Sequence, residues 1–219
     1  MDKIIKILVR FYPVFLKGLG GTLWLAAATV LFGTVLGLVI AILRMSRIRV
    51  FNAAAGVYIE ILRGTPILLQ LYFFWLMLPK IMPFEMSDTA AILVALIINA
   101  SAYISEIIRA GIAAVDPGQW EAARSLGLSE TNMMRKIILP QAVKNILPAL
   151  CNEFIAEVKG TSLASVFFIP ELTTSYRTVQ STTFLSIQPL LIAGMIYLFV
   201  TTVLSWAVRR MERRLKASD

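Results

Sequence analysis

An uninterrupted run without charge, from Leu19 to Leu43, places the strongest constraint on this chain. A helix rises about 1.5 Å per residue, so this run is long enough to cross about 30 Å of hydrocarbon with some tilt. Ile187 to Val208 is similar, with Pro189 near its start. The 219 residues are 58% hydrophobic, which is too apolar for an ordinary soluble domain. The sequence therefore predicts an all-α integral membrane protein.

Three weaker spans are predicted at Ala53–Leu78, Thr89–Ala113 and Ile137–Val158, and each carries charge or proline. In the last of these, the Leu, Ile, Val and Phe side chains favour insertion by about −3 to −6 kcal/mol in total. Three charges, each costing up to about 3 kcal/mol, can cancel that gain. They are Lys144, Glu153 and Glu157, and Pro140 and Pro148 add possible kinks. We expect this span to lie among other helices or along a water-filled path.

Five transmembrane helices place the two termini on opposite sides of the membrane. With a cytoplasmic C-terminus, seven of the 21 basic residues lie outside and the other fourteen inside, as the positive-inside rule favours. The outside set is Lys3, Lys6, Arg10, Lys17, Lys80, Lys159 and Arg177. The predicted organisation is an amphipathic N-terminal segment over residues 1–18, one five-helix domain over 19–208 and a basic cytoplasmic tail over 209–219. The first segment, interrupted by Pro13, lacks a signal-peptide cleavage pattern.

A short cytoplasmic helix is predicted between the third and fourth spans, within residues 114–140. Asp116 and Pro117 form a helix start, and Gly127 a natural stop after about Leu126. Ser129 can cap the next helix. Trp120, Ala123 and Gly127 share one side, which places a large anchor beside two small residues. Taken alone, the segment would be interpreted as an ordinary amphipathic connector on the membrane surface.

The same segment carries a complete signature. Glu121, Ala122 and Ala123 are followed after three intervening residues by Gly127, and after nine more intervening residues by Ile137, Leu139 and Pro140. This is the EAA loop, and the chain therefore resembles the membrane subunits of ABC importers. Further segments are similar to the permeases of polar amino acid importers along nearly the whole chain. They are FLKGLGGTL at 15–23, RGTPILLQ at 63–70, AYISEIIRAGI at 102–112 and NEFIAEVKGTSLASV at 152–166.

The resemblance implies an assembly in the bacterial cytoplasmic membrane. Its members would be an ABC ATPase subunit, a second permease that is identical or related, and an extracytoplasmic amino-acid-binding protein. The coupling residues, which would contact the ATPase, would be Trp120, Glu121, Ala122, Ala123, Gly127, Ile137, Leu139 and Pro140. ATP and Mg would be bound by the ATPase, since no GxxxxGK[ST] sequence occurs in this chain.

Other function classes fit the sequence less well. Histidine is absent and Cys151 is the only cysteine, so we expect no histidine metal site, no catalytic triad and no intramolecular disulfide. The net charge of +8 marks a cytoplasmic membrane face better than it marks a nucleic-acid-binding surface. A self-contained secondary amino acid transporter or channel is the alternative, and a membrane enzyme is a third. The absence of an internal repeat argues against the transporter, and scattered carboxylates argue against the enzyme.

Polar residues at mid-membrane depth are predicted to line the substrate path, or else to join helices by hydrogen bonds. They are Gln70, Asn99, Tyr103, Asn152 and Glu153. The chain departs from the family pattern after Glu153, where Glu157 follows one helical turn later. Two carboxylates at that spacing repel unless a cation lies between them, which suggests a basic amino acid as cargo. Headgroup water or pairing with Lys159 would explain Glu157 equally well.

Two further features remain open at the sequence level. Arg63, Gly64, Thr65 and Pro66 interrupt the second span, either as a structural hinge or as a tight packing site. Glu106 and Arg109 lie three residues apart and can pair. That pair is either a latch that positions the EAA helix or a simple charge pair at the membrane boundary.

Overall fold

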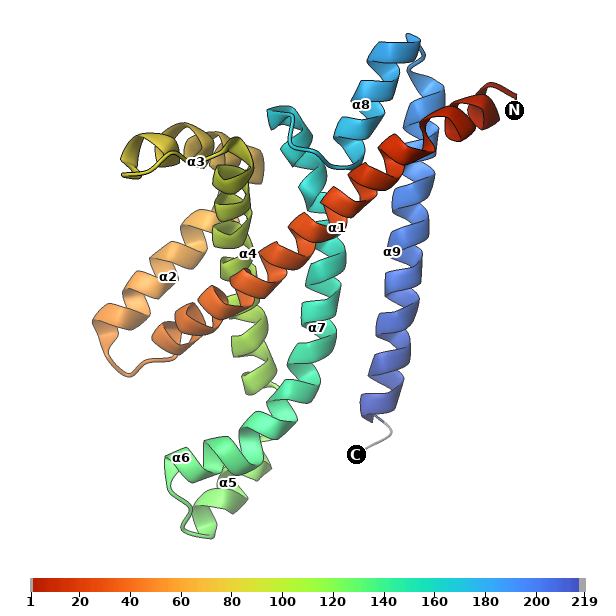
Figure 1. The fold of residues 1–219 in the computed structure, drawn as a ribbon. Helices are drawn as coiled ribbons and strands as arrows, with labels where there is room; N and C mark the ends of the chain where they lie inside the picture. Colours follow the sequence, from red (N-terminus) through yellow and green to blue (C-terminus); the bar gives the residue numbers. More distant parts are fainter. Residues whose placement is uncertain (1, 217–219) are drawn as a thin grey trace.

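The computed structural model describes residues 2–216, and within that range the chain is built from helices without strands (Figure 1). In chain order they are α1 (Asp2–Arg44), α2 (Arg49–Gly64), α3 (Ile67–Ile81), α4 (Asp88–Ala113), α5 (Pro117–Ser125), α6 (Glu130–Met133), a π-helical turn (Met134–Ile138), α7 (Leu139–Gly160), a 3-10 segment (Thr161–Phe167), α8 (Leu172–Thr183) and α9 (Ile187–Lys216). Met1 and residues 217–219 of the predicted tail lie outside the described residues.

Helix α4 lies at the centre and packs against α1, α2, α3 and α7. Small side chains let α1 cross it at close range. A Cβ on Gly37 of α1 would lie 3.0 Å from the backbone oxygen of Ser101 on α4, and Ala100 on the same face is fully buried. Close approach of small residues is the usual basis of helix packing in a membrane, where no hydrophobic driving force acts between helices.

Helix α1 continues through Pro13, where the sequence suggested an interruption. Proline removes only the hydrogen bond to the carbonyl four residues earlier. That residue is Val9, which is 68% exposed, so this part of the helix lies at the surface. The carbonyl left without a helical partner is therefore not in the protein core, and the helix continues. The continuous helix is about 65 Å long at about 1.5 Å per residue, twice the thickness of the hydrocarbon core.

The five-span prediction is supported for three to four helices. Within the described part of the chain, α1, α4 and α9 are long and apolar enough to cross a membrane. The predicted span Ala53–Leu78 is not one straight helix, because α2 and α3 meet at a bend of 109°, and together they count as at most one broken span. Helix α7 is not among the helices apolar enough to cross a membrane by composition, because Lys144, Glu153 and Glu157 lower its mean hydropathy.

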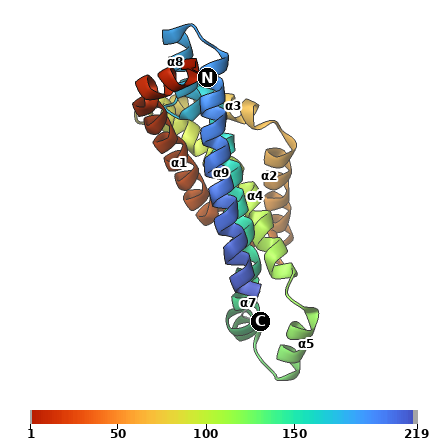
Figure 2. The same ribbon diagram turned by 90° about the vertical axis from the view of Figure 1, so that its right-hand side faces the viewer.

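The two ends of the molecule differ in construction (Figures 1 and 2). At one end, here named the α8 end, the loop before α8 lies against α1. A Cβ on Gly21 of α1 would collide with the backbone carbonyl of Pro170, and one on Gly18 with the Ser175 side chain. At the other end, named the α5 end, α5 and α6 project beyond the ends of α4 and α7.

A buried carboxylate, Glu171, connects two helices at the α8 end by hydrogen bonds. Glu171 is fully buried and accepts hydrogen bonds from the backbone N–H of Thr173 at 2.7 Å and from the Tyr197 hydroxyl of α9 at 2.9 Å. The backbone N–H of Leu172 donates to Thr22 Oγ1 of α1 at 3.1 Å. Helices α1, α8 and α9 therefore meet in one hydrogen-bonded junction.

Candidate coupling and translocation sites

The predicted coupling helix forms with the predicted caps. Asp116 accepts a hydrogen bond from Gly118 N at 2.6 Å, and Pro117 occupies the first helical position of α5. Gly127 has φ +71°, the left-handed conformation that suits glycine, and Ser129 caps α6. The local start and stop signals of the sequence are confirmed, with the end of α5 at Ser125.

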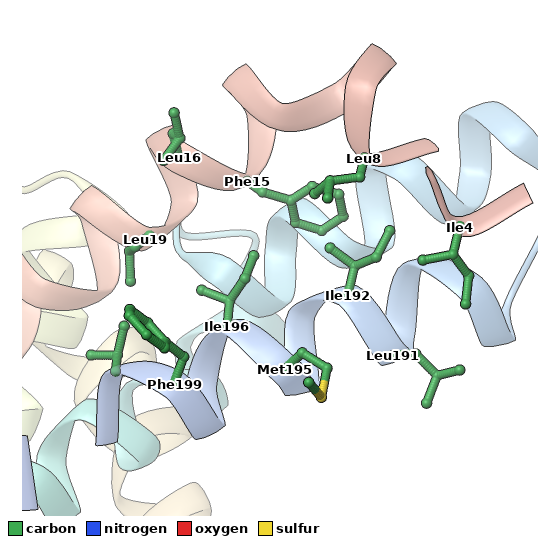
Figure 3. A pocket seen from close by; sticks show the side chains of 11 residues that line it. Ile4, Leu8, Phe15, Leu16, Leu19, Leu191, Ile192, Met195, Ile196 and Phe199 are labelled. Carbon is green, nitrogen blue, oxygen red and sulfur yellow. The ribbon is translucent and has the colours of Figure 1, made fainter. Parts of the chain in front are cut away.

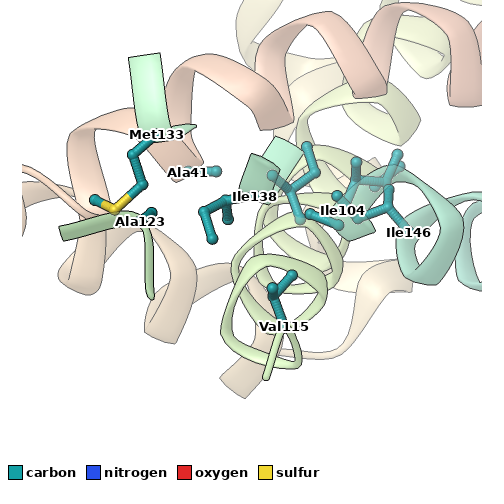
Figure 4. Packing of buried hydrophobic residues seen from close by; sticks show 10 residues of the cluster. Ala41, Ile104, Val115, Ala123, Met133, Ile138 and Ile146 are labelled. Carbon is teal, nitrogen blue, oxygen red and sulfur yellow. The ribbon is translucent and has the colours of Figure 1, made fainter. Parts of the chain in front are cut away.

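The side of α5 that we expected to face a partner faces the chain itself. Ala123 is 1% exposed and packs with Met133 and Ile138 (Figure 4). Trp120 packs against the same cluster. A short helix with few apolar side chains must use them to attach to its own subunit, and the small Ala123 permits that close contact. In the C-terminal half of α5, Glu121, Ala122, Arg124 and Ser125 remain exposed, as do Pro117, Gly118 and Gln119 in its first turn.

A π-helical turn joins this cluster to α7. Leu139 N bonds to Met134 O, five residues back, just before Pro140, which has no N–H to donate. One residue later, Gln141 donates its side-chain amide to Ile137 O at 3.0 Å. The same amide lies 3.2 Å from Gln119 Oε1 of α5. Helix α5 is therefore connected to the first turn of α7 by apolar packing and by an amide pair.

A second link at the α5 end is ionic. Arg47, in the turn between α1 and α2, pairs with Glu130 of α6. The two side chains are 85% and 68% exposed, so the pair contributes at most about 1 kcal/mol.

A polar surface pocket of about 300 Å³ lies between the end of α2, the middle of α4 and α7. Glu106 makes two hydrogen bonds with Arg109, at 2.9 and 2.8 Å, and Arg63 lies 3.9 Å from the same carboxylate. The Arg63 guanidinium also lies 5.4 Å from the Tyr103 ring centroid. The pocket is lined by Arg63, Tyr103, Glu106, Ile107, Ala110 and Glu153. The Glu106 and Arg109 pair thus belongs to a charged pocket wall and is not isolated.

Two of the predicted path residues hold the bend between α2 and α3. The Gln70 amide donates to Leu62 O at 2.8 Å and to Thr65 Oγ1 at 2.8 Å, across the break at Gly64 and Pro66. Asn99 of α4 donates to Gln70 Oε1 at 2.8 Å. Both amides are buried, and neither lines the pocket. Their hydrogen bonds are of the helix-joining kind that the sequence left as an alternative.

The remaining path residues separate along α7. Glu153 is half-buried at the pocket, whereas Asn152 is exposed and does not line it. Glu157 is 6% exposed, and its Oε2 has no hydrogen-bond partner among the described residues. Within the described chain, Glu157 makes no salt bridge with Lys159. The burial of the Glu157 side chain also excludes contact with headgroup water. Glu157 is therefore a buried carboxylate with an unsatisfied oxygen, one helical turn along α7 from the pocket residue Glu153.

Of the α4 residues that line the pocket, only Tyr103 was predicted from the sequence as a residue of the substrate path. Tyr103, Glu106, Ile107 and Ala110 lie at i, i+3, i+4 and i+7, which is one helix face. That spacing could have been read from the sequence by extending the face from Tyr103. The position of Arg63 beside Glu106 could not have been predicted from the sequence, because it depends on the 109° bend between α2 and α3.

Comparison with known proteins agrees with this architecture. The family model described as "Binding-protein-dependent transport system inner membrane component" matches residues 33–217. The arginine transport system permease protein ArtQ of Bacillus subtilis (strain 168) is 38% identical over 94% of both chains. The glutamine transport system permease protein GlnP of Escherichia coli (strain K12) is 37% identical over 93% of this chain and 94% of its own.

A solved structure of an amino acid ABC transporter with histidines has a TM-score of 0.90 and 43% identity, covering 94% of this chain and 96% of its own. The MetNI methionine ABC transporter, at a TM-score of 0.72 and 19% identity, shares the fold. The chain therefore belongs to the family of binding-protein-dependent transport system inner membrane components, as an amino acid ABC transporter permease.

Proposed function

We propose that this chain forms half of the translocation path of an ATP-driven amino acid importer and couples that path to a separate ATPase through α5. An extracytoplasmic binding protein would deliver the amino acid. One observation carries the proposal: α5, the π-helical turn and α7 form a continuous connection that ends at the pocket residue Glu153. From Leu139 to Glu153 this connection covers about 21 Å of helix, at about 1.5 Å per residue.

In this mechanism the ATPase contacts the exposed face of α5 at Glu121, Ala122 and Arg124. Closure of the ATPase pair displaces α5, and the cluster around Ala123 transmits the movement to the π-helical turn. Helix α7 then shifts against α4, which changes the distance between Glu153 and the charges of Arg63 and Glu106. A small displacement at one end thereby alters the polar pocket at the other, as alternating access requires.

We further propose that α7 is the fifth span and that the α5 end lies in the cytoplasm of a bacterial cell. The distribution of basic residues supports this orientation. The polar side chains of α7 would be costly in lipid, but one of them, Glu153, faces a pocket that a second permease subunit can cover. Arg63 keeps 45% of its side chain exposed there, so a partner is needed to enclose the path. A symmetric or pseudo-symmetric pair would do so.

The cargo that best fits α7 is a basic amino acid. Glu153 and Glu157 place two carboxylates on successive turns, and the unpartnered Glu157 Oε2 is a potential acceptor for a cationic side chain or an ammonium group. The similarity to an arginine permease supports this choice, while the glutamine relatives keep a neutral cargo as the rival. Competition uptake by the reconstituted complex separates them. Inhibition by excess glutamine but not by arginine or lysine would contradict the basic cargo.

Coupling is tested by charge reversal on the exposed face of α5. Glu121→Lys should leave membrane insertion and the yield of the assembled complex unchanged but lower substrate-stimulated ATP hydrolysis by at least about tenfold. Glu85→Lys, an equally exposed reversal in the α3–α4 loop, is the matched control and should keep wild-type activity. Unchanged coupling in Glu121→Lys, or an equal loss in the control, would refute the role of α5.

A further inference from the structure

The first turns of α1 carry their positive charges on one face. Lys3, Lys6, Arg10 and Lys17 are spaced by three, four and seven residues, so they form one stripe along the helix. All four side chains are exposed. These four residues are named the basic stripe. Their arrangement is independent of the coupling helix and of the pocket, both of which lie elsewhere in the molecule.

No protein carboxylate neutralises the basic stripe within residues 3–215, because none of the salt bridges there includes its members. Within the basic stripe, the Arg10 guanidinium makes a cation–π contact with the Phe11 ring, 5.4 Å from the ring centroid. Four like charges on one helix face repel one another. An anionic ligand outside the protein would relieve that repulsion.

An apolar groove of about 650 Å³ lies on another side of the same helical segment, between α1 and α9 (Figure 3). Its wall on α1 includes Ile4, Leu8, Leu16 and Leu19, and its wall on α9 includes Met195 and Phe199. The exposed fraction of Phe199 is 70% and that of Met195 is 64%, although both are large and apolar. Open apolar surface of this extent in a membrane protein is suited to lipid chains.

The position of the segment explains why one helix carries both features. Helix α1 is about 65 Å long, twice the hydrocarbon thickness, and runs obliquely past the end of α9 at the α8 end (Figure 1). Its first turns therefore lie near the edge of the bilayer. A helix with an exposed apolar face and a basic face is typical of that boundary, where the apolar side enters the acyl region and the charges meet headgroups.

We propose that the N-terminal part of α1 is a binding site for anionic phospholipid, with headgroup phosphates along the basic stripe and acyl chains in the α1–α9 groove. A soluble acidic protein would match the stripe but leave the groove without an apolar occupant. A second copy of the chain docked on this face would bring one basic stripe near another and add repulsion. Lipid satisfies both surfaces, since each basic residue near an anionic surface strengthens the attraction by about fivefold.

The test is lipid retention by the assembled transporter. The complex is reconstituted in liposomes with equal amounts of phosphatidylglycerol and phosphatidylcholine of identical acyl chains, then extracted and washed in detergent. Mass spectrometry gives the ratio of the two lipids that remain bound. The wild-type complex should retain phosphatidylglycerol at least about fivefold over phosphatidylcholine, and K3Q/K6Q/R10Q/K17Q should bring that ratio close to one.

Three controls and one pair of fallback variants keep the outcome decisive. R209Q/R210Q/R213Q/R214Q removes the same charge at the opposite end of α9 and should retain at least half of the enrichment. The charge-preserving variant K3R/K6R/R10K/K17R should retain all of it. If the quadruple glutamine variant does not assemble, the pairs K3Q/K6Q and R10Q/K17Q should each give an intermediate ratio. Excess sn-glycerol 3-phosphate should not displace the lipid, because it carries the phosphate without the chains.

Several results would overturn the proposal. One is wild-type enrichment in the glutamine variants, and another is an equal loss in the α9 control. Displacement by sn-glycerol 3-phosphate would mean that the site recognises a free phosphate. Unchanged lipid retention in the stripe variant, combined with lost stimulation of ATP hydrolysis by the binding protein, would assign the stripe to protein docking instead.

Discussion

The α8 end and the α5 end are held together in different ways. At the α8 end, α1 approaches the loop before α8 so closely that Gly21 has no room for a Cβ. Glu171 joins α8 to α9 through hydrogen bonds, and Leu172 N bonds to Thr22 of α1. At the α5 end, a small apolar cluster around Ala123 and Met133, an amide pair and one exposed ion pair attach α5 and α6. Tight backbone contact cannot adjust gradually, whereas a small apolar cluster and exposed polar links can shift at low cost.

The difference suggests a division of roles within one subunit. The α8 end fixes α1, α8 and α9 relative to one another, and the α5 end serves as the movable element that an ATPase can displace. Substitutions at the α8 end should therefore affect stability more than coupling, and substitutions at the α5 end should do the reverse.

The largest expected effect is on stability, from Gly21→Ala. The new Cβ would meet the carbonyl of Pro170, which is backbone and cannot rotate away, so we expect a loss of about 3 kcal/mol. Thermal unfolding of the purified complex measures it. Gly20→Ala is the matched control, because no atom lies within 4 Å of its Cβ position. Equal melting temperatures for the two variants would show that the α8 end is not tightly fixed.

The helices of this architecture were largely predictable because their signals are local. The apolar runs of α1 and α9, and the cap at Asp116 with the stop at Gly127, each depend on residues within one or two turns. The burial of Ala123 was not predicted, because a helix alone does not reveal whether its apolar side meets its own subunit or a partner. Likewise the bend between α2 and α3 was located, but its angle is set by Gln70 and Asn99 from two different helices.

At the α8 end, Glu171→Gln should lower stability by less than Gly21→Ala does. The carboxylate accepts hydrogen bonds from Thr173 N and from the Tyr197 hydroxyl, and neutralising it weakens these charge-assisted bonds. We expect a loss of about 2 kcal/mol in unfolding free energy, with coupling per folded complex unchanged. Glu85→Gln, on an exposed side chain, should change stability by less than about 0.5 kcal/mol. Lost coupling without lost stability in Glu171→Gln would contradict the division of roles.

At the α5 end, Gly127→Ala tests the turn after the coupling helix. Alanine at φ +71° is strained by about 1 kcal/mol, although no neighbouring atom would be displaced. Relief of that strain should reorient α5 and reduce substrate-stimulated ATP hydrolysis at least about twofold, with little change in melting temperature. Gly194→Ala, on α9, has the same open surroundings without a positive φ, so it should keep normal coupling. Equal activity of the two variants would show that α5 tolerates reorientation.

The smallest expected effect comes from the amide pair between α5 and α7. Gln119 and Gln141 lie 3.2 Å apart at an exposed site, so their hydrogen bond contributes only about 0.5–1 kcal/mol to stability. Gln119→Leu, Gln141→Leu and the double variant form a cycle in which the coupling energy is read from substrate-stimulated ATP hydrolysis. If the pair transmits movement, the two single variants should reduce coupling by similar amounts and the double variant by no more than either. Additive losses would mean that each residue acts separately, Gln141 by bonding Ile137 O beside Pro140, and that movement passes from α5 to α7 through the Ala123 cluster alone.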